Sequence, residues 1–490
     1  METSPKRTAL VAVDLGALSC RVSLLRWKQG RPQIHVIHRF PNAPIATEEG
    51  LRWDAGSILD GVKNGLRLCA DAAPEGIASV GVDGWAVDYV RLNENGNAIA
   101  DPFCYRDERT QQAEQKVHTI ISPSRLYSLT GIQLLGLNTL YQLYADKLAG
   151  RRPSTAWLNV PEYVTYCLGW RGVAEYTNAT HTQLVRLSSQ AWCEEIFEEL
   201  GLDISAAPTI VPTGSVVGCI GGEFSRLRAL CNAKLVVPAC HDTASAIAAI
   251  PASGEDWAFM SSGTWSLVGT VLTTPCVSEE AQRMNFTNLG GAGRSICFLK
   301  NVNGMWLLGQ CMKEWEVRGM TVPLSELVQE CESLPSPDNL IDVDDPPLAL
   351  PGEMLGKINA QLQRAGHRTF TSERRDIPLV ANMIFHSMAQ RYAEVLGSIA
   401  AITGKRLKRL FIVGGGSKNT LLNRLTEERT GLEVLPGSPE STTLGNFSIQ
   451  MAVLQGSCND TTGVAASSVA QWAEEFAEPV FEETRNRGTA

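Results

Sequence analysis

Two segments that lie far apart in the chain share one layout, and they restrict the possible fold more than any other feature. TALVAVDLG (8–16) is an apolar run that ends in Asp14 and a glycine, and the apolar segment RVSLLRW (21–27) follows a short turn. WAFMSSGTWSLVGTVL (257–272) also places a small polar turn between two apolar runs. Short apolar runs bounded by turn residues are typical of buried strands. The layout predicts two halves that each open on a β-hairpin, as after an internal duplication.

Strands and helices are mixed along both halves. SILDGVKNGLRLCADAA (57–73) has helical periodicity, and IASVGVDGWAVDYVRL (77–92) returns to strands. The long periodic segment 377–404 predicts a helix that stops at Gly404, a natural helix end. These patterns predict an α/β protein. The polar, acidic tail is expected to end in a frayed segment.

Composition excludes several function classes. The 490 residues are 44% hydrophobic and 19% charged, with a net charge of −9, as in ordinary globular proteins. Excess negative charge argues against nucleic acid or an anionic membrane as the main partner, although a local basic pocket for phosphate remains possible. No apolar run approaches the roughly 18 residues of a membrane helix, and Asp14 interrupts the N-terminal run too early for a signal peptide. We therefore expect a cytoplasmic protein.

Cysteine and histidine usage gives little support to a metal centre. The chain has 13 cysteines and seven histidines, without a C-x-x-C pair or an H-E-x-x-H sequence. Scattered cysteines in a cytosolic chain are most simply reduced core residues, and a zinc site would need paired ligands.

Three small-residue loops are suited to phosphate or nucleotide. DLGALSCR (14–21) and SSGTWS (261–266) combine glycine turns with hydroxyl donors, and DLGALSCR adds a guanidinium. FIVGGGSKN (411–419) lets a ligand approach the backbone before a helix begins. Each loop alone is more simply explained as an ordinary turn, because none matches G-x-G-x-x-G or a Walker sequence.

HDTASA (241–246) places a charged carboxylate in a small, apolar stretch. Asp242 could cap a helix, which stabilises a helix by about 1 kcal/mol. It could equally serve as a general base if the fold holds it beside a hydroxyl group. His241 taken alone is better explained as a structural histidine than as a catalytic one.

The ordered set of motifs resembles the FGGY family of carbohydrate kinases over roughly residues 8–455. The segments that carry the resemblance are VAVDLGA, GVDGWAVDYV, YRDERT, GIQLLGLNTLYQL, EYTNATHTQL, HDTASA, SSGTWSL, LKNVNGMWLL, IVGGGSKNTLLN and STTLGN. The resemblance implies two actin- or hexokinase-like (ribonuclease H-like) α/β lobes with a sugar and nucleotide cleft between them. It implies an N-terminal sugar- and phosphate-binding lobe, 1–248, and a C-terminal nucleotide-binding lobe, 249–490.

The resemblance also implies an ATP- and Mg²⁺-dependent kinase, with L-rhamnulose phosphorylated at O1 as the expected reaction. Asp242 would be the general base and Asp14 would help to position Mg²⁺. The sugar would meet Ala86, His241, Asp242, Thr243 and Asn301; the nucleotide would meet Ala17, Leu18, Ser19, Cys20, Arg21, Thr264, Gly309 and Gly415. The expected partners are the sugar and ATP, with no nucleic acid or membrane, and the chain is expected to be a monomer or a homodimer.

Several positions depart from the family pattern. Relatives usually read D-L-G-A-S-S-G-R, whereas Leu18 and Cys20 here replace a serine and a glycine. One hydroxyl donor is lost, and Cys20 could forbid a positive φ that glycine tolerates. Ala86 stands where a glycine contacts substrate, and Gly309 stands where a glutamine can lie near the nucleotide. These changes concern sugar identity and ATP affinity more than the reaction class.

Three alternatives remain open at this point. The first is the same reaction on another ketose, such as L-fuculose or L-xylulose. The second is a binding protein that senses sugar or nucleotide without turnover, although such a protein has no need of Asp242 as a base. The third, a chaperone- or filament-type ATPase of the same fold, is disfavoured because too few residues follow STTLGN to form a peptide-binding region.

Overall fold

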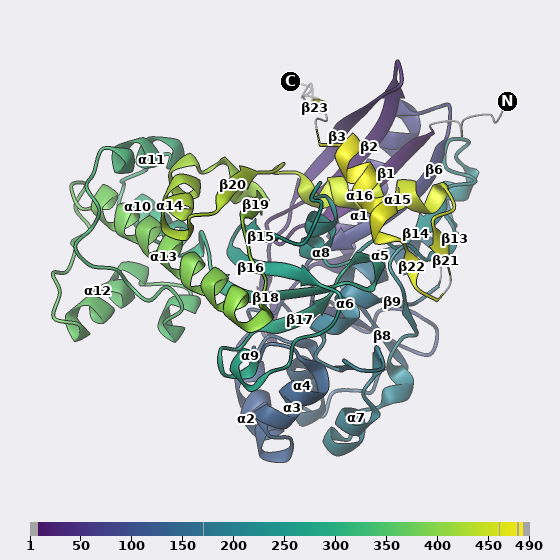
Figure 1. Cartoon of the computed structure of the whole chain (residues 1–490). Helices are drawn as coiled ribbons and strands as arrows, with labels where there is room; N and C mark the ends of the chain where they lie inside the picture. Colours follow the sequence, from purple (N-terminus) through teal and green to yellow (C-terminus); the bar gives the residue numbers. More distant parts are fainter. Residues whose placement is uncertain (1–7, 170, 460, 478–479, 484–490) are drawn as a thin grey trace. The chain divides into compact units, whose positions relative to one another are not determined.

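The computed structural model describes residues 8–169, 171–459, 461–477 and 480–483. The chain divides into two compact units (Figure 1). Unit 1 comprises Met1–Pro251, Val271–Phe298 and Ser441–Ala490, and unit 2 comprises Ala252–Thr270 and Leu299–Glu440. The expected frayed end falls on 484–490, which lie outside the described residues.

Unit 1 is built on a seven-stranded sheet of order β13-β14-β6-β1-β2-β3-β23. The strands are β1 Ala9–Leu15, β2 Ser19–Lys28, β3 Arg31–Pro41, β6 Ile77–Gly84, β13 Val216–Cys219, β14 Lys234–Val236 and β23 Val480–Glu483. Strand β2 pairs antiparallel with both β1 and β3. Strand β6 lies parallel to β1, and β14 lies parallel to β6. The predicted opening hairpin is therefore confirmed.

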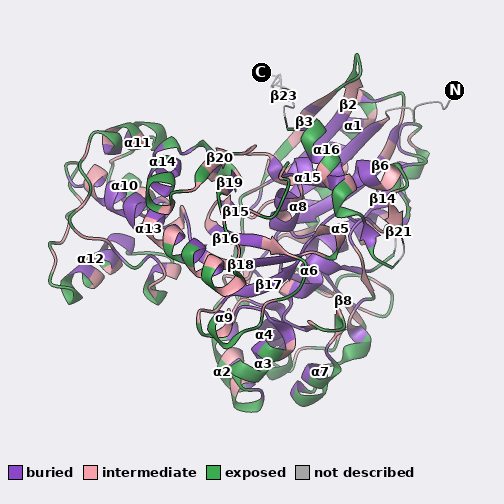
Figure 2. Cartoon of the chain, viewed as in Figure 1, coloured by how far each residue is buried: buried purple, intermediate pink, exposed green. Residues whose placement is uncertain are grey.

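Helices cover both faces of this sheet, which explains why all of β1 is buried. Val11 and Val13 pack with α1 (Ala55–Ala72) and α5 (Val160–Gly169) on one face. Leu10 and Ala12 pack on the other face with α8 (Asp242–Ala248), α15 (Ser441–Leu454) and α16 (Ala466–Glu475). The alternation follows the two-residue period of a strand. Figure 2 shows α8 as largely buried.

The rest of unit 1 is made of short elements, and several of them pack around a cluster of buried side chains that includes Tyr141 and Phe197. Its helices are α2 Thr110–Ile120, α3 Pro123–Thr130, α4 Thr139–Leu148, α6 Tyr176–His181, α7 Glu194–Leu200 and α9 Glu279–Arg283. Its short strands are β4 Ile45–Thr47, β5 Gly50–Arg52, β7 Tyr89–Leu92, β8 Ala156–Asn159, β9 Ala174–Glu175, β10 Val185–Arg186, β11 Ala191–Trp192, β12 Ile210–Val211, β17 Thr287–Gly290, β21 Cys458–Asn459 and β22 Gly463–Val464.

Unit 2 contains the central strands of a second sheet, of order β17-β18-β16-β15-β19-β20. These strands are β15 Trp257–Ser262, β16 Trp265–Leu272, β18 Ile296–Asn303, β19 Arg409–Val413 and β20 Glu433–Pro436. Strand β15 pairs antiparallel with β16 and parallel with β19, and β19 pairs parallel with β20. The same pairing pattern joins β1, β2, β6 and β14, so the topology agrees with an internal duplication.

The helices of unit 2 are α10 Trp306–Val317, α11 Leu324–Glu332, α12 Met354–Arg364, α13 Ile377–Thr403 and α14 Thr420–Thr430. Helix α13 confirms the helix predicted over 377–404. Gly404 caps it with a left-handed φ of 71°, a conformation that costs glycine little. None of the helices in the described part of the chain is long and apolar enough to cross a membrane.

Helices α8 and α15 approach so closely that a glycine is required between them. A Cβ added at Gly445 would lie 1.7 Å from the carbonyl oxygen of Ser245. Because this obstacle is backbone, the two helices themselves would have to separate. Gly397 on α13 offers a contrast, because an added Cβ there meets nothing within 4 Å.

We expect Gly445→Ala to lower the free energy of unfolding by about 2 kcal/mol or more, because overpacking outweighs the gain in helix propensity. Gly397→Ala is the matched control, and it should stabilise the protein by up to about 1 kcal/mol. Thermal melting followed by circular dichroism compares each variant with wild type. Equal melting temperatures for Gly445→Ala and wild type would contradict the close packing of α8 on α15.

Candidate active site

Three carboxylates of unit 1 gather where parallel strands of the sheet have their carboxyl ends. Asp14 near the end of β1 is the direct partner of Asp83 on the parallel strand β6. Beyond them, Gly84 forms a parallel bridge with His241, immediately before Asp242 opens α8. The carboxyl ends of parallel strands are where α/β proteins place their ligand sites. The register therefore gathers charge at the position where a site is expected.

Asp14 forms an ion pair with Arg21 across the β1–β2 hairpin. The two residues are cross-strand partners, and the Nε and Nη2 atoms of Arg21 lie 2.8 and 2.7 Å from Oδ2 of Asp14. Asp14 is 3% exposed, so the carboxylate is held in a poorly solvated position beside a single guanidinium. Both residues were predicted to belong to the site, and the structure brings them together.

Asp242 is the first helical residue of α8, and His241 occupies the N-cap position without a side-chain capping bond. The simpler explanation of Asp242 as an N-cap therefore does not hold. Its side chain is 33% exposed, and its Oδ1 accepts a hydrogen bond from Thr243 Oγ1 at 3.2 Å. Burial, followed by the negative charge of Asp14, raises the pKa of Asp242 to about 7. Such a carboxylate can both accept and release a proton near neutral pH.

Asp83 is a site residue that sequence reasoning missed. It is fully buried, and its Oδ2 accepts a hydrogen bond from Asn446 Nδ2 at 2.5 Å, while Oδ1 has no hydrogen-bond partner among the described residues. Burial and the nearby Asp14 hold the pKa of Asp83 well above its usual range. A carboxylate inside a buried strand run, as at Asp14, was the available signal.

The segment that joins β1 to β2 contains the two unusual residues Leu18 and Cys20, and the structure resolves the question raised by Cys20. Cys20 lies within β2 with its side chain in the core, and it is not among the described residues with positive φ. Its thiol therefore leaves the loop uncrowded. Leu18 is 73% exposed, so the loss of a hydroxyl donor remains. Gly16 is needed because an added Cβ would lie 2.6 Å from the carbonyl oxygen of Ser19.

The segment after β6 holds Ala86 in a strained, tightly bonded loop. Val87 has a φ of 69°, which is unusual for a β-branched residue and marks stored backbone strain. Asp88 fixes the loop by accepting hydrogen bonds from the indoles of Trp53 and Trp85, the amide of Tyr105 and the side chain of Gln142. Ala86 itself is 8% exposed.

One imidazole lies beside Asp242, and a second imidazole contacts the first. His241 Nε2 is 3.4 Å from Asp242 Oδ1, and His241 Nδ1 is 3.1 Å from Nε2 of His181 on α6. Burial lowers the pKa of both rings, that of His181 to about 3, so both are neutral at pH 7. His181 is a second residue that the sequence did not reveal, because only the contact with His241 distinguishes it.

The remaining predicted residues, Thr264, Asn301, Gly309 and Gly415, belong to unit 2. The turn that carries Thr264 is held by the start of α10, since Trp306 N donates to the Thr264 carbonyl at 3.2 Å. Glycines 414 and 416 pack against Ser262, where an added Cβ would lie 2.9 and 2.0 Å from Ser262 oxygens. An added Cβ at Gly415 or Gly309 meets nothing within 4 Å, so both positions face open space.

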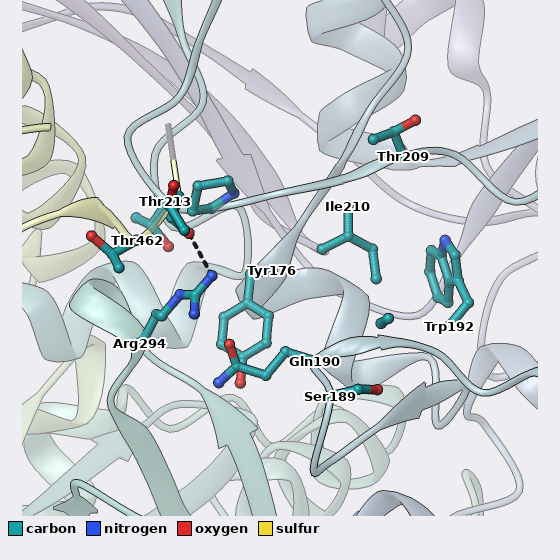
Figure 3. Close-up of a pocket in the computed structure, with 12 residues that line it drawn as sticks. Tyr176, Ser189, Gln190, Trp192, Thr209, Ile210, Thr213, Arg294 and Thr462 are labelled. Carbon is teal, nitrogen blue, oxygen red and sulfur yellow. Dashed lines mark hydrogen bonds between the residues drawn. The ribbon is translucent and has the colours of Figure 1, made fainter. Parts of the chain in front are cut away.

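A pocket of about 570 Å³ also opens on unit 1, and Figure 3 shows its lining. None of the predicted site residues lines it. Several of its polar groups are already paired within the protein: Thr213 donates to Glu175, Trp192 to the Pro208 carbonyl, and Arg294 to the Thr461 carbonyl. The described residues also contain no group of three or more His, Cys, Asp or Glu side chains placed to hold a metal ion.

Comparison with known proteins identifies the family. Residues 9–249 match the N-terminal domain, and residues 258–454 the C-terminal domain, of the FGGY family of carbohydrate kinases. The chain is 36% identical over 458 residues to the rhamnulokinase of Bacteroides thetaiotaomicron, covering 92% of each chain. It is 37% identical over 457 residues to the rhamnulokinase of an Enterobacter species, covering 91% of this chain and 89% of that one.

Solved structures agree with this assignment at the level of the fold. A ligand-bound xylulose kinase from Lactobacillus acidophilus aligns over 96% of both chains with a TM-score of 0.75 and 15% identity. The glycerol kinase of Plasmodium falciparum with ADP covers 98% of this chain and 94% of its own, with a TM-score of 0.73 and 13% identity. The expected actin- and hexokinase-like α/β fold is thereby confirmed. The chain belongs to the FGGY family of carbohydrate kinases, and it is an ATP-dependent sugar kinase.

Proposed function

We propose that this kinase transfers the γ-phosphoryl group of ATP to O1 of L-rhamnulose, with Asp242 as the general base. The observation that carries the assignment of the base is a partly exposed carboxylate at the start of α8, beside Asp14, with a pKa near 7. The similarity to rhamnulokinases over about nine-tenths of the chain supports the choice of sugar. Phosphoryl transfer depends on positioning and charge stabilisation, and the site needs a single base for the attacking hydroxyl.

Asp242 would take the proton of the primary hydroxyl as O1 attacks. His241 and Thr243 flank Asp242 in sequence and contact its carboxylate, so they are suited to hold neighbouring sugar hydroxyls. The rigid loop at Ala86 would form another wall of the sugar site, and Asn301 of unit 2 would complete it. A strained but fully bonded loop favours a fixed wall that selects sugar shape.

The turn after β1 and the first residues of β2, Ala17 to Arg21, would bind the phosphates. Arg21 is the guanidinium of this loop, and Gly16 lets the loop turn tightly at its start. Asp14 would help to hold Mg²⁺, which neutralises phosphate charge. The residues fit such an ion, because Mg²⁺ prefers one or two carboxylates plus phosphate oxygens, and Asp83 Oδ1 beside Asp14 is buried without a hydrogen-bond partner.

Unit 2 would supply the nucleotide contacts. Thr264 would meet the γ-phosphate region and Gly415 the adenosine side, with Gly309 on α10 near the nucleotide. The open space at Gly309 and Gly415 suits positions that face a ligand. We retain 1–248 and 249–490 as the proposed lobes; a monomer or homodimer and a cytoplasmic location stay predictions.

We expect Asp242→Asn to lower kcat with L-rhamnulose about 10²- to 10⁴-fold, because the amide cannot accept the hydroxyl proton. The assay is ADP release with Mg-ATP and a panel of ketoses. Asp71→Asn on the exposed side of α1 is the matched control and should keep full activity.

Each alternative has its own result in this assay. Turnover with L-fuculose or L-xylulose but not L-rhamnulose would replace the sugar and keep the base. Sugar and ATP binding without turnover in the wild-type protein would favour a sensor. Undiminished kcat in Asp242→Asn would remove Asp242 as the base.

The pKa of Asp242 predicts how activity depends on pH. The base works only when ionised, so kcat/KM for the sugar should rise with pH and reach half its plateau near pH 7. Below that point it should fall about tenfold per pH unit. The measurement uses saturating Mg-ATP between about pH 5 and 9. A flat profile through pH 7 would contradict the proposed base.

Substitutions at two adjacent glycines distinguish an effect on nucleotide binding from an effect on folding. We expect Gly415→Ala to fold normally but to raise the KM for ATP several-fold, because its methyl group enters open space where adenosine is proposed to lie. Gly416→Ala should instead destabilise the protein by about 1–3 kcal/mol through its collision with Ser262. Melting temperature and ATP titration distinguish the two. An unchanged KM for ATP in Gly415→Ala would place adenosine elsewhere.

A further inference from the structure

The segment EYTNATHTQL (175–184) carries part of the family resemblance but has no role in the proposed reaction. It forms the end of β9 and helix α6, which begins after Glu175 and ends at His181. Glu175, Thr177 and Asn178 are fully buried although they are polar. Polar groups are buried at a cost unless they are paired, so their partners indicate what the segment does.

One buried carboxylate holds both α6 and the backbone that leads to His241. Glu175 Oε2 accepts hydrogen bonds from Thr177 Oγ1 at 2.5 Å and from the amide of Cys240 at 2.9 Å. The amide of His241 donates to Thr177 Oγ1 at 3.3 Å. Helix α6 and residues 240–241 are therefore tied to the same atoms.

A second carboxylate supports this anchor. Glu162 on α5 accepts hydrogen bonds from the amide of Glu175 at 3.2 Å and from Nδ2 of Asn178 at 2.8 Å. Thr213 donates to the other oxygen of Glu175 at 2.5 Å. A network bonded at this many points leaves the rings of His181 and His241 little freedom to move relative to one another.

The contact between these two rings restricts where their protons lie. His181 Nε2 and His241 Nδ1 are 3.1 Å apart, and such a contact between neutral imidazoles needs one N–H group between them. His241 Nε2 lies 3.4 Å from Asp242 Oδ1. An ionised carboxylate favours an N–H on the nitrogen that faces it. A neutral ring has only one N–H, so His241 Nδ1 is the acceptor and His181 Nε2 the donor.

We propose that His181 is a positioning residue for phosphoryl transfer: by donating to His241 Nδ1, it acts together with the Asp242 carboxylate to fix neutral His241 as the Nε2–H tautomer. His241 then presents an N–H to Asp242 Oδ1 and to the sugar beside it. The opposite tautomer would turn a lone pair toward the carboxylate and repel it. This inference rests on the proposed role of Asp242 as the base.

The direct test is the tautomer of His241 in protein labelled with ¹⁵N-histidine. Long-range ¹H–¹⁵N spectra distinguish Nδ1–H from Nε2–H, and His241→Gln assigns the resonance. We expect Nε2–H for His241 in the wild-type protein and a mixture of tautomers in His181→Leu. An Nδ1–H ring in the wild-type protein, or an unchanged Nε2–H ring in His181→Leu, would overturn the proposal.

Kinetics provide an independent measurement. His181→Leu should lower kcat with L-rhamnulose by about 10- to 100-fold, by analogy with the loss of the outer hydrogen-bond partner of a metal-binding histidine, with KM for ATP within about twofold. His181→Gln retains an N–H donor and should recover most of kcat. Equal losses in Leu and Gln variants of unchanged melting temperature would contradict a donor role. If His181→Leu does not fold, His181→Asn, too short to reach His241, replaces it.

The control is His118→Leu, which removes another part-buried histidine of unit 1, one that contacts Tyr141. It should leave kcat and the His241 resonance unchanged. The two proposals fail in distinguishable ways. Full activity in Asp242→Asn would remove the base, but it would not alter what the spectrum of the wild-type protein says about His241. An Nδ1–H ring in the wild-type protein, together with an inactive Asp242→Asn variant, would overturn only the role of His181.

Discussion

The burial of three neighbouring carboxylates, together with the repulsion among them, is the constraint on which the rest of the site depends. The β1–β6 register places Asp14 beside Asp83. The bridge between Gly84 and His241 brings Asp242 to the same end of these strands. Arg21 and Asn446 offset part of this repulsion. Burial, followed by the negative charge of Asp14, raises the pKa of Asp242 from 3.8 to about 7, so the folded state binds this proton more tightly than the unfolded chain. Its stabilising contribution is complete at low pH and is lost as pH rises through 7, so the ionised base works against folding.

The two hairpins of the duplicated topology are used differently. The β1–β2 hairpin carries an acid and a base as cross-strand partners, Asp14 and Arg21, which suits it to phosphate and cation chemistry. The β15–β16 hairpin carries hydroxyl groups instead, and glycines 414 and 416 pack against its Ser262. One backbone arrangement therefore carries an ion pair on one sheet and a hydroxyl-bearing turn packed closely against glycines on the other. The topology determines where the loops lie, and their side chains determine what they bind.

The sequence predicted what is local and missed what depends on distant contacts. Strand runs, the helix end at Gly404 and the proximity of Asp14 to Arg21 follow from periodicity, capping and hairpin geometry. Asp83 was missed because its importance comes from parallel register with Asp14, across about seventy residues of chain. His181 acquires a role only through its contact with His241, and the strain at Val87 has no sequence signal. The sequence suggested that Cys20 could forbid a positive φ in the loop, because its place in a strand with the side chain in the core depends on tertiary structure.

The departures from the family pattern bear on whether the chain turns over its substrate. Cys20 places its thiol in the core and keeps the β1–β2 loop uncrowded, while Leu18 removes one hydroxyl donor but leaves Arg21 and the backbone of the loop in place. Ala86 lies in a loop held by four hydrogen bonds to Asp88, so the position of its methyl group is fixed. A binding protein would gain stability by replacing Asp242 with a neutral residue. A carboxylate with a pKa of about 7 and the neutral imidazole of His241 beside it fits the proposed general base better than a site that only binds.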